Sequence, residues 1–139
     1  MMQAIIKFDH LYIDGGCNAC GVVRCESYTL YYLDKEIGFG FLDLENLIPA
    51  IVQANGWRQS YEEVGIGEEM EGFKKGETFI QAELNGHQMT YINHTSGEKI
   101  MTSNSYKNDN AQLFATINEI LTRLFDIEAI NFVMEEIDA

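Results

Sequence analysis

Three cysteines lie close together near the start of the sequence and could hold a metal ion. Cys17 and Cys20 form a C-x2-C pair, and Cys25 follows a few residues later. The turn inside such a pair can direct both thiolates toward one tetrahedral Zn²⁺. A structural zinc site needs four ligands, so a histidine would have to complete it. The zinc hypothesis therefore has the ligands His10, Cys17, Cys20 and Cys25, since His10 lies in the segment that leads into the cysteine turn.

The same cysteines also have a simpler explanation. Free thiols persist in a reducing cytosol, and a buried cysteine behaves as a small apolar side chain. A thioredoxin-like site would place the pair at a helix N-terminus after a strand, whereas this pair precedes a strand. A cysteine nucleophile would need a histidine nearby, and no flanking motif supports one. We therefore expect a protein that is not an enzyme, with no catalytic residue and no cofactor, and keep the cysteine cluster as the alternative site.

An acidic segment at residues 57–72 is the second candidate site, because apolar residues alternate there with glutamates. Carboxylates steer a basic partner toward the surface, and buried rings supply most of the affinity of a protein interface. A solvated loop whose apolar residues fold back on the core would have the same composition. The protein-binding residues that we predict are Trp57, Tyr61, Glu62, Glu63, Glu68, Glu69 and Glu71.

The net charge restricts the class of partner. The sequence has 22 acidic and 9 basic residues, which gives a formal charge of −13. A field of that sign repels phosphate backbones and anionic lipids, so we expect neither direct nucleic-acid binding nor membrane binding. It favours a basic protein partner, although negative charge also simply keeps a protein in solution.

Targeting signals are not evident in the sequence. Lys7 and Asp9 interrupt the apolar residues at the N-terminus, and no small-residue cleavage site follows. No apolar run is long enough to span a bilayer. Together with the odd number of cysteines, these features favour a cytoplasmic location.

The elements that would position these groups form an α+β pattern. Residues 3–13, 21–33 and 37–42 are rich in aliphatic, aromatic and β-branched side chains and are expected to form strands. The apolar stripe from Leu44 to Val52 predicts an amphipathic helix. We expect that helix to begin near Asn46, because this keeps Pro49 in the first turn.

The second half of the sequence contains the clearest local signal. Residues 78–84 and 87–93 are strand-like and flank Asn85-Gly86, the preferred pair for a type I′ hairpin turn. Residues 98–103 are expected to add a third strand. Asp109 or Asn110 can cap a second helix that runs to Phe125. Residues 57–72 have no clear assignment, and the tail at 127–138 fits either a helix or, preferably, a strand around 131–134.

This order of elements predicts one domain over residues 1–139. Hairpins instead of alternating βαβ units favour an antiparallel sheet of about five to seven strands, with the two main helices packed on one face.

In size, charge and lack of a catalytic motif, the chain is similar to bacterial toxin-immunity proteins, which cap a basic toxin. No sequence motif adds to that similarity. We therefore predict a non-enzymatic inhibitor that neutralises a basic protein such as a nuclease toxin or a defence nuclease. The alternative is a small metal-binding or ligand-binding domain, or an enzyme, that uses Cys17, Cys20 and Cys25. A homo-oligomer is compatible with either function.

Overall fold

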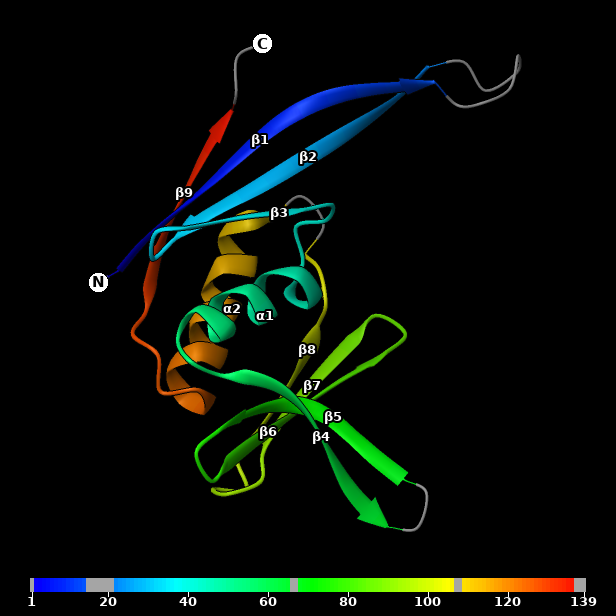
Figure 1. Cartoon of the computed structure of the whole chain (residues 1–139). Coiled ribbons are helices and arrows are strands. Elements are labelled where there is room, and N and C mark those ends of the chain that lie inside the picture. Colours follow the sequence, from blue (N-terminus) through cyan, green and yellow to red (C-terminus); the bar gives the residue numbers. More distant parts are fainter. Residues whose placement is uncertain (1, 15–21, 66–67, 107–108, 137–139) are drawn as a thin grey trace.

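A computed structural model describes most of the chain as two β-sheets with two helices between them (Figure 1). The described part comprises nine strands and two helices. The backbone is described for residues 2–14, 22–65, 68–106 and 109–136, and the side chains for the same residues except 9–14, 22–26, 63–65 and 68.

The first sheet has four strands in the order β3-β2-β1-β9. Neighbouring strands are antiparallel except for β1 and β9, which are parallel. In Figure 1, β1 and β2 extend well past the helices as a two-stranded arm. The strands are β1 (Met2–Asp14), β2 (Val22–Tyr32), β3 (Lys35–Phe39) and β9 (Ile130–Glu136).

The second sheet is an antiparallel meander of five strands in sequence order. Its consecutive strands follow one another closely in the sequence, so all its pairings are local. The strands are β4 (Arg58–Gly65), β5 (Glu68–Lys75), β6 (Thr78–Asn85), β7 (Gln88–Asn93) and β8 (Lys99–Ser103).

Both helices begin at an aspartate whose side chain accepts a backbone N–H of the first turn. Asp43 caps α1 (Leu44–Ala54), and Asp109 caps α2 (Asn110–Leu124). Such caps satisfy an otherwise orphaned amide and stabilise a helix by about 1 kcal/mol. Within the described residues, neither helix is long and apolar enough to cross a membrane.

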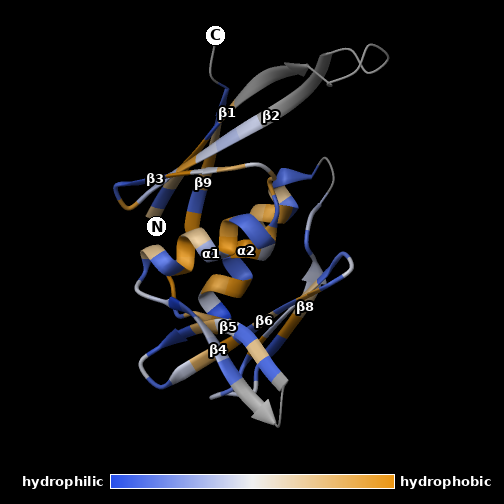
Figure 2. Ribbon diagram, turned by 45° about the vertical axis from the view of Figure 1, so that its right-hand side comes forward, coloured by the Kyte–Doolittle hydropathy of each residue, from blue (hydrophilic) through white to orange (hydrophobic). Residues whose placement is uncertain are grey.

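The core is a continuous apolar cluster to which both helices and both sheets contribute. Figure 2 shows the apolar sides of α1 and α2 facing inward between the sheets. Phe125, at the end of α2, is nearly fully buried and makes edge-to-face contacts with Trp57, Phe73 and Tyr91. Phe73 belongs to β5 and Tyr91 to β7, and Trp57 directly precedes β4. The ring contacts therefore fix the end of α2 over the second sheet.

The structure confirms the α+β class, but the strands are more numerous than predicted and form two sheets, one of which contains a parallel pair. The helices contact both sheets instead of covering one face of a single sheet. The first helix begins at Leu44 and not near Asn46, so Pro49 lies in its interior. The turn between β6 and β7 lies one residue later than predicted. Asn85 pairs with Gln88, so the turn consists of Gly86 and His87, and of these two only Gly86 has a positive φ, at +65°. Glycine at the first central position is typical of a type II′ turn.

Candidate functional site

The candidate site is a groove of about 280 Å³ that opens where two hairpins of the second sheet separate. Gly72 pairs with Gln81, and the register between β5 and β6 is described only from that pair toward Lys75. Toward the other end of β5, its described partner is β4 alone. The β4–β5 and β6–β7 hairpins consequently diverge, as Figure 1 shows.

Gly72 is required at the point where the hairpins separate. A Cβ atom placed on this residue would lie 2.1 Å from the carbonyl oxygen of Ile80 and 2.9 Å from the Cα atom of Gln81. Only glycine allows the two backbones to approach this closely. The shape of the groove therefore depends directly on a residue without a side chain.

The groove has an apolar floor and an acidic rim. Phe73 and Met89 are buried beneath it, whereas Glu45 of α1 and Glu71 of β5 are exposed. Its polar side chains are two carboxylates and one carboxamide, and the described lining contains no Lys, Arg or His. The lining residues are Glu45, Pro49, Gln59, Glu71, Gly72, Phe73, Ala82, Leu84 and Met89.

The β4–β5 ribbon continues the acidic rim past the groove. Tyr61 lies directly opposite Glu71 in the register, and 61% of its surface is exposed. Glu69, two residues before Glu71, is exposed as well. Because alternate residues of a strand share a face, these three side chains lie on one side of the ribbon. We call Tyr61, Glu69 and Glu71 the ribbon surface.

Glu62, which the sequence grouped with these residues, is differently placed. Its neighbouring position in β4 puts it on the other side of the ribbon, where its Oε1 atom lies 3.1 Å from Nζ of Lys74. Glu63 and Glu68 pair with Glu69 and Gly65 in the backbone register, and their side chains lie outside the described part.

The structure places Trp57 in the core instead of at the surface. Only 6% of its surface is exposed, and its ring packs edge-on against Phe125 with centroids 5.0 Å apart. Its Nε1 atom is buried and has no hydrogen-bond partner in the described part of the protein. Trp57 thus supports the base of the ribbon from inside and is not part of the ribbon surface.

The start of α1 places negative charge beside a buried tyrosine next to the groove. Tyr91 is 1% exposed, and burial, followed by the charges of Asp43 and Glu45, raises the pKa of its hydroxyl far above the ordinary 10.0. The backbone N–H of Glu45 donates to the Asn104 side chain at 2.9 Å, which fixes this end of the helix to the loop after β8. The carboxylates at this helix start are therefore held at a defined place above the second sheet.

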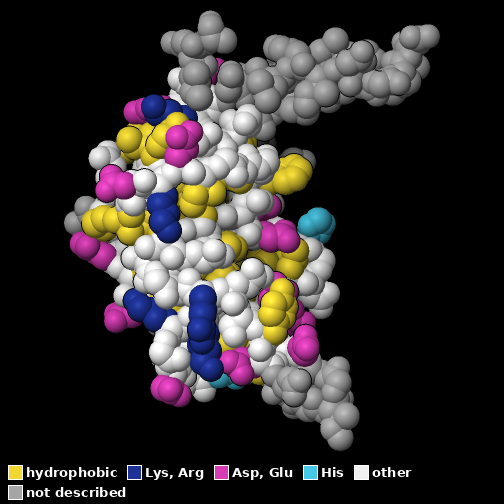
Figure 3. All heavy atoms as spheres, in the orientation of Figure 1, with side chains coloured by type: hydrophobic (Ala, Val, Ile, Leu, Met, Phe, Trp, Pro, Cys, Tyr) yellow, Lys and Arg dark blue, Asp and Glu magenta, His cyan; other side chains and the backbone are white. Residues whose placement is uncertain are grey.

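On the face shown in Figure 3, lysine and arginine side chains lie over the left half and the centre, and acidic side chains lie on both sides. The right-hand edge, where the hairpins open, shows acidic and hydrophobic side chains together. In the described part, Lys74 pairs with Glu62 and Arg123 pairs with Glu98 and Glu119, and none of these pairs involves Glu45 or Glu71.

The zinc ligands predicted from the sequence lie wholly or partly outside the described part of the chain. Cys17 and Cys20 lie outside the described residues, and the side chains of His10 and Cys25 are not described. In the backbone register, His10 pairs with Glu26 and Cys25 pairs with Leu11. In the part of the chain whose side chains are described, no group of three or more His, Cys, Asp or Glu residues could hold a metal ion.

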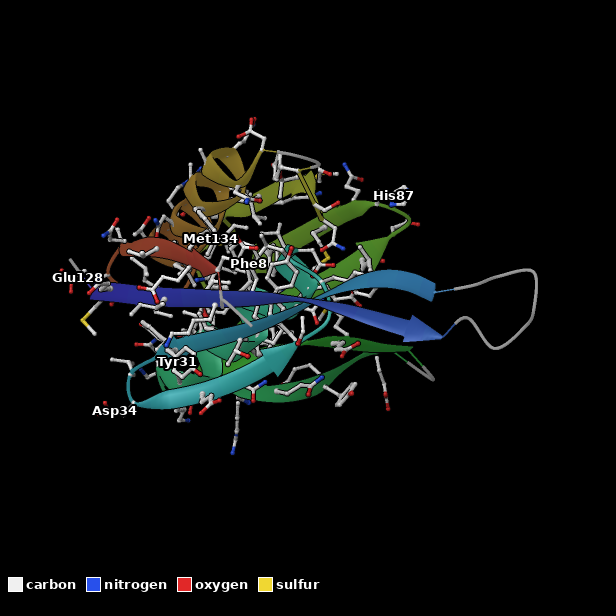
Figure 4. The ribbon with its side chains drawn as sticks, turned by 90° about the horizontal axis from the view of Figure 1, so that it is seen from above. Phe8, Tyr31, Asp34, His87, Glu128 and Met134 are labelled. Atoms are coloured by element: carbon white, nitrogen blue, oxygen red, sulfur yellow. The ribbon has the colours of Figure 1, made fainter. Side chains whose placement is uncertain are left out.

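The two other histidines lie in the second sheet, far along the chain from the cysteines. His87 lies in the β6–β7 turn, at the tip of that hairpin (Figure 4). His94 stacks on Phe79 with ring centroids 5.8 Å apart, and its Nε2 atom lies 2.9 Å from Oε1 of Gln81. These contacts are explained by a structural role, in which the His94 ring covers Phe79.

Sequence reasoning missed most of the groove. Glu45 and Pro49 were treated only as helix residues, and Leu84 and Met89 only as strand residues. The available signal was Gly72, since a glycine within a strand indicates a bulge or a close backbone approach.

Comparison with known proteins identifies the family of the chain. No curated protein and no solved structure matches the chain. One family profile, described as "Domain of unknown function (DUF4809)", matches residues 1–134, which is nearly the whole sequence. The chain therefore belongs to the DUF4809 family.

Proposed function

We propose that this protein is a non-enzymatic binding protein that docks a basic protein partner on the ribbon surface and the adjoining groove. The observation that carries the proposal is the exposed ring of Tyr61 directly opposite Glu71, beside a groove with an apolar floor and an acidic rim. Tyrosine is enriched at the energetic centres of interfaces, and surrounding carboxylates raise the rate of encounter with a cationic protein.

The more specific form of the proposal is an inhibitor or immunity-type protein. The net charge of −13 supports a strongly basic partner, as nucleases are, because such enzymes carry positive surfaces for nucleic acid. An acidic ribbon that projects from the fold suits the occupation of a positively charged cleft. In this form, binding blocks access of nucleic acid to the partner.

The test is capture of the partner from the native host, followed by comparison of matched variants against that one partner. Tyr61→Ala combined with Glu69→Gln and Glu71→Gln is expected to weaken binding at least tenfold, which corresponds to about 1.4 kcal/mol. The control is Glu77→Gln combined with Glu83→Gln, which removes two exposed carboxylates elsewhere. Retention of full affinity by the ribbon variant would count against the proposal.

Salt dependence and inhibition give two further readouts. Raising the ionic strength is expected to slow association of the wild-type protein markedly, because screening shortens the range of the charges. If the partner is a nuclease, its activity is expected to fall in proportion to bound protein. A complex of unchanged affinity and association rate in high salt contradicts a charge-driven interface.

The alternative is metal or ligand binding by Cys17, Cys20 and Cys25. It predicts one zinc per chain in freshly purified protein, and loss of that zinc in a Cys17→Ser, Cys20→Ser double variant. Elemental analysis separates it from the binding function, because the ribbon surface requires no metal.

A further inference from the structure

We infer that the groove receives an arginine side chain of the basic partner. This inference rests on the proposed function and adds to it the chemical group that the groove recognises. The ribbon surface then steers and covers the partner, while the groove holds one long cationic side chain between α1 and the two diverging hairpins.

The shape and lining of the groove suit such a side chain. Long basic side chains combine an apolar stem with a charged head. Phe73 and Met89 are 5% exposed and form an apolar floor, and Leu84, which is 40% exposed, forms part of the wall. The stem can therefore lie on apolar surface while the head reaches the acidic rim.

The two carboxylates on the rim are acceptors that come from different elements. Glu45 belongs to α1 and Glu71 to β5. Pro49 has no N–H, so the backbone carbonyl of Glu45, four residues earlier, lacks the donor that a helix normally provides. Glu71 accepts one hydrogen bond from Nε2 of Gln59 at 2.9 Å, and a carboxylate can accept several more.

The cations of this protein nearest in sequence to Glu71 are engaged elsewhere. Lys74 pairs with Glu62 on the other side of the ribbon, and Nζ of Lys75 donates to the backbone oxygen of Asn55 at 2.9 Å. Glu45 and Glu71 take part in none of the ion pairs in the described part of the chain. A cation supplied by a partner therefore meets two carboxylates that form no ion pair with any lysine or arginine whose side chain the structure describes.

Arginine fits this arrangement better than lysine. A guanidinium presents five donors in one plane, so it can serve acceptors on α1 and on β5 together, and its weak hydration lets it lie against a ring or a thioether. An ammonium is a compact, strongly hydrated charge, which loses more by leaving water. Binding of lysine is accordingly expected to be weaker.

The test uses the full chain and N-acetyl-arginine-N-methylamide, followed by NMR of the Met89 methyl group and the Gly72 amide. Both signals are expected to shift saturably, with Kd on the order of 1 mM for so small a ligand. The neutral isostere N-acetyl-citrulline-N-methylamide is expected to bind at least about fivefold more weakly, because it lacks the charge. Equal binding of the citrulline or lysine analogue, or an unshifted Met89 signal, overturns the inference.

Matched charge variants locate the site. Glu45→Gln with Glu71→Gln is expected to weaken binding of the arginine probe at least about fivefold, whereas Glu77→Gln with Glu83→Gln removes the same charge and is expected to change it less than about twofold. Equal losses of affinity in the two double variants would indicate that overall charge alone attracts the probe. That result would contradict the assignment of the groove as the binding site. Thermal unfolding confirms that each variant is folded.

The two proposals can fail separately. If the partner binds the ribbon surface but the arginine probe does not bind, only the assignment of the groove is wrong. If the probe binds the groove but the ribbon variants retain the partner, the assignment of the groove stands and the proposed docking surface is wrong.

Discussion

Gly72 of β5 and Ile80 of β6 approach each other so closely that a Cβ atom on Gly72 would lie 2.1 Å from the Ile80 carbonyl oxygen. This contact marks the place where the two hairpins begin to separate, and it borders the groove. The stability of the second sheet and the shape of the candidate site therefore depend on the same residue.

Gly72→Ala is expected to lower the free energy of unfolding by about 2 kcal/mol or more, because a backbone atom cannot move aside as a flexible side chain can. Urea unfolding followed by circular dichroism measures the change. The control is Gly38→Ala in β3, where an added Cβ atom has no neighbour within 4 Å, so stability should stay the same or rise by about 0.5 kcal/mol. Equal stability of the two variants would contradict the close approach.

Asn118 joins α2 to the start of β9 with a pair of hydrogen bonds. Its Nδ2 atom donates to the Ile130 carbonyl at 2.8 Å, and its Oδ1 atom accepts the Ile130 N–H at 2.7 Å. Asn118→Ala leaves both backbone groups without these partners and is expected to cost about 2–3 kcal/mol. Hydrogen exchange should show faster exchange of the Ile130 amide than of the β7 amides. Thr122→Ala, which removes a hydroxyl exposed on α2, serves as the control.

The raised pKa of Tyr91 predicts a loss of stability in strong base. The buried hydroxyl stays protonated in the folded protein, whereas in the unfolded chain it ionises near pH 10.0. The stabilising contribution is complete below that pH and is lost above it, at about 1.4 kcal/mol per pH unit. Unfolding free energies measured between pH 8 and pH 11 should fall less steeply above pH 10 for Tyr91→Phe than for the wild type. Tyr61→Phe, which removes the hydroxyl of an exposed ring, is the matched control.

Trp57 is expected to contribute to folding and not to partner binding. Trp57→Ala removes a buried ring that packs on Phe125 and should cost about 3–5 kcal/mol. Trp57→Phe should cost less, because it also removes the buried Nε1 donor that has no partner among the described groups. Affinity of the folded Trp57→Phe variant for the partner should be unchanged. A clear loss of affinity would contradict this prediction and would assign Trp57 to the interface.

The helices and the local hairpins could be predicted because their signals are local. The apolar stripe and the Asp109 cap define α2, and the alternation on either side of Gly86 defines β6 and β7. The start of α1 was harder, since Pro49 suggests a later first turn. The Asp43 cap determines the start at Leu44, and the proline is accommodated in the interior.

The β4–β5 hairpin and the partner of β9 could not be read from local pattern. Residues 58–65 and 68–75 contain many glutamates and glycines, which have low strand propensity, and their pairing is stabilised by buried neighbours such as Phe73. The strand character of β9 is visible in its sequence, but its parallel pairing with β1 depends on contacts between distant segments.

The groove escaped sequence analysis for the same reason. Glu45 and Glu71 are far apart in sequence, and only the packing of α1 over the second sheet brings them to one rim. The acidic segment that the sequence singled out does contain Glu71, which lines the groove. The sequence singled out Tyr61 by composition alone. Its exposure could not be predicted, because it follows from the projection of the ribbon.

The parallel pairing of β1 with β9 has a consequence for the order in which the chain acquires structure during translation. The meander β4–β8 is contiguous in sequence, so its strands can pair as soon as that segment has left the ribosome. The first sheet must wait, because one edge of β1 gains its neighbour only when β9, the last described element, has been made. During synthesis, therefore, the edge of β1 that later pairs with β9 stays uncovered for longer than any edge that becomes paired within the meander, and a chaperone that binds extended segments would find its target there.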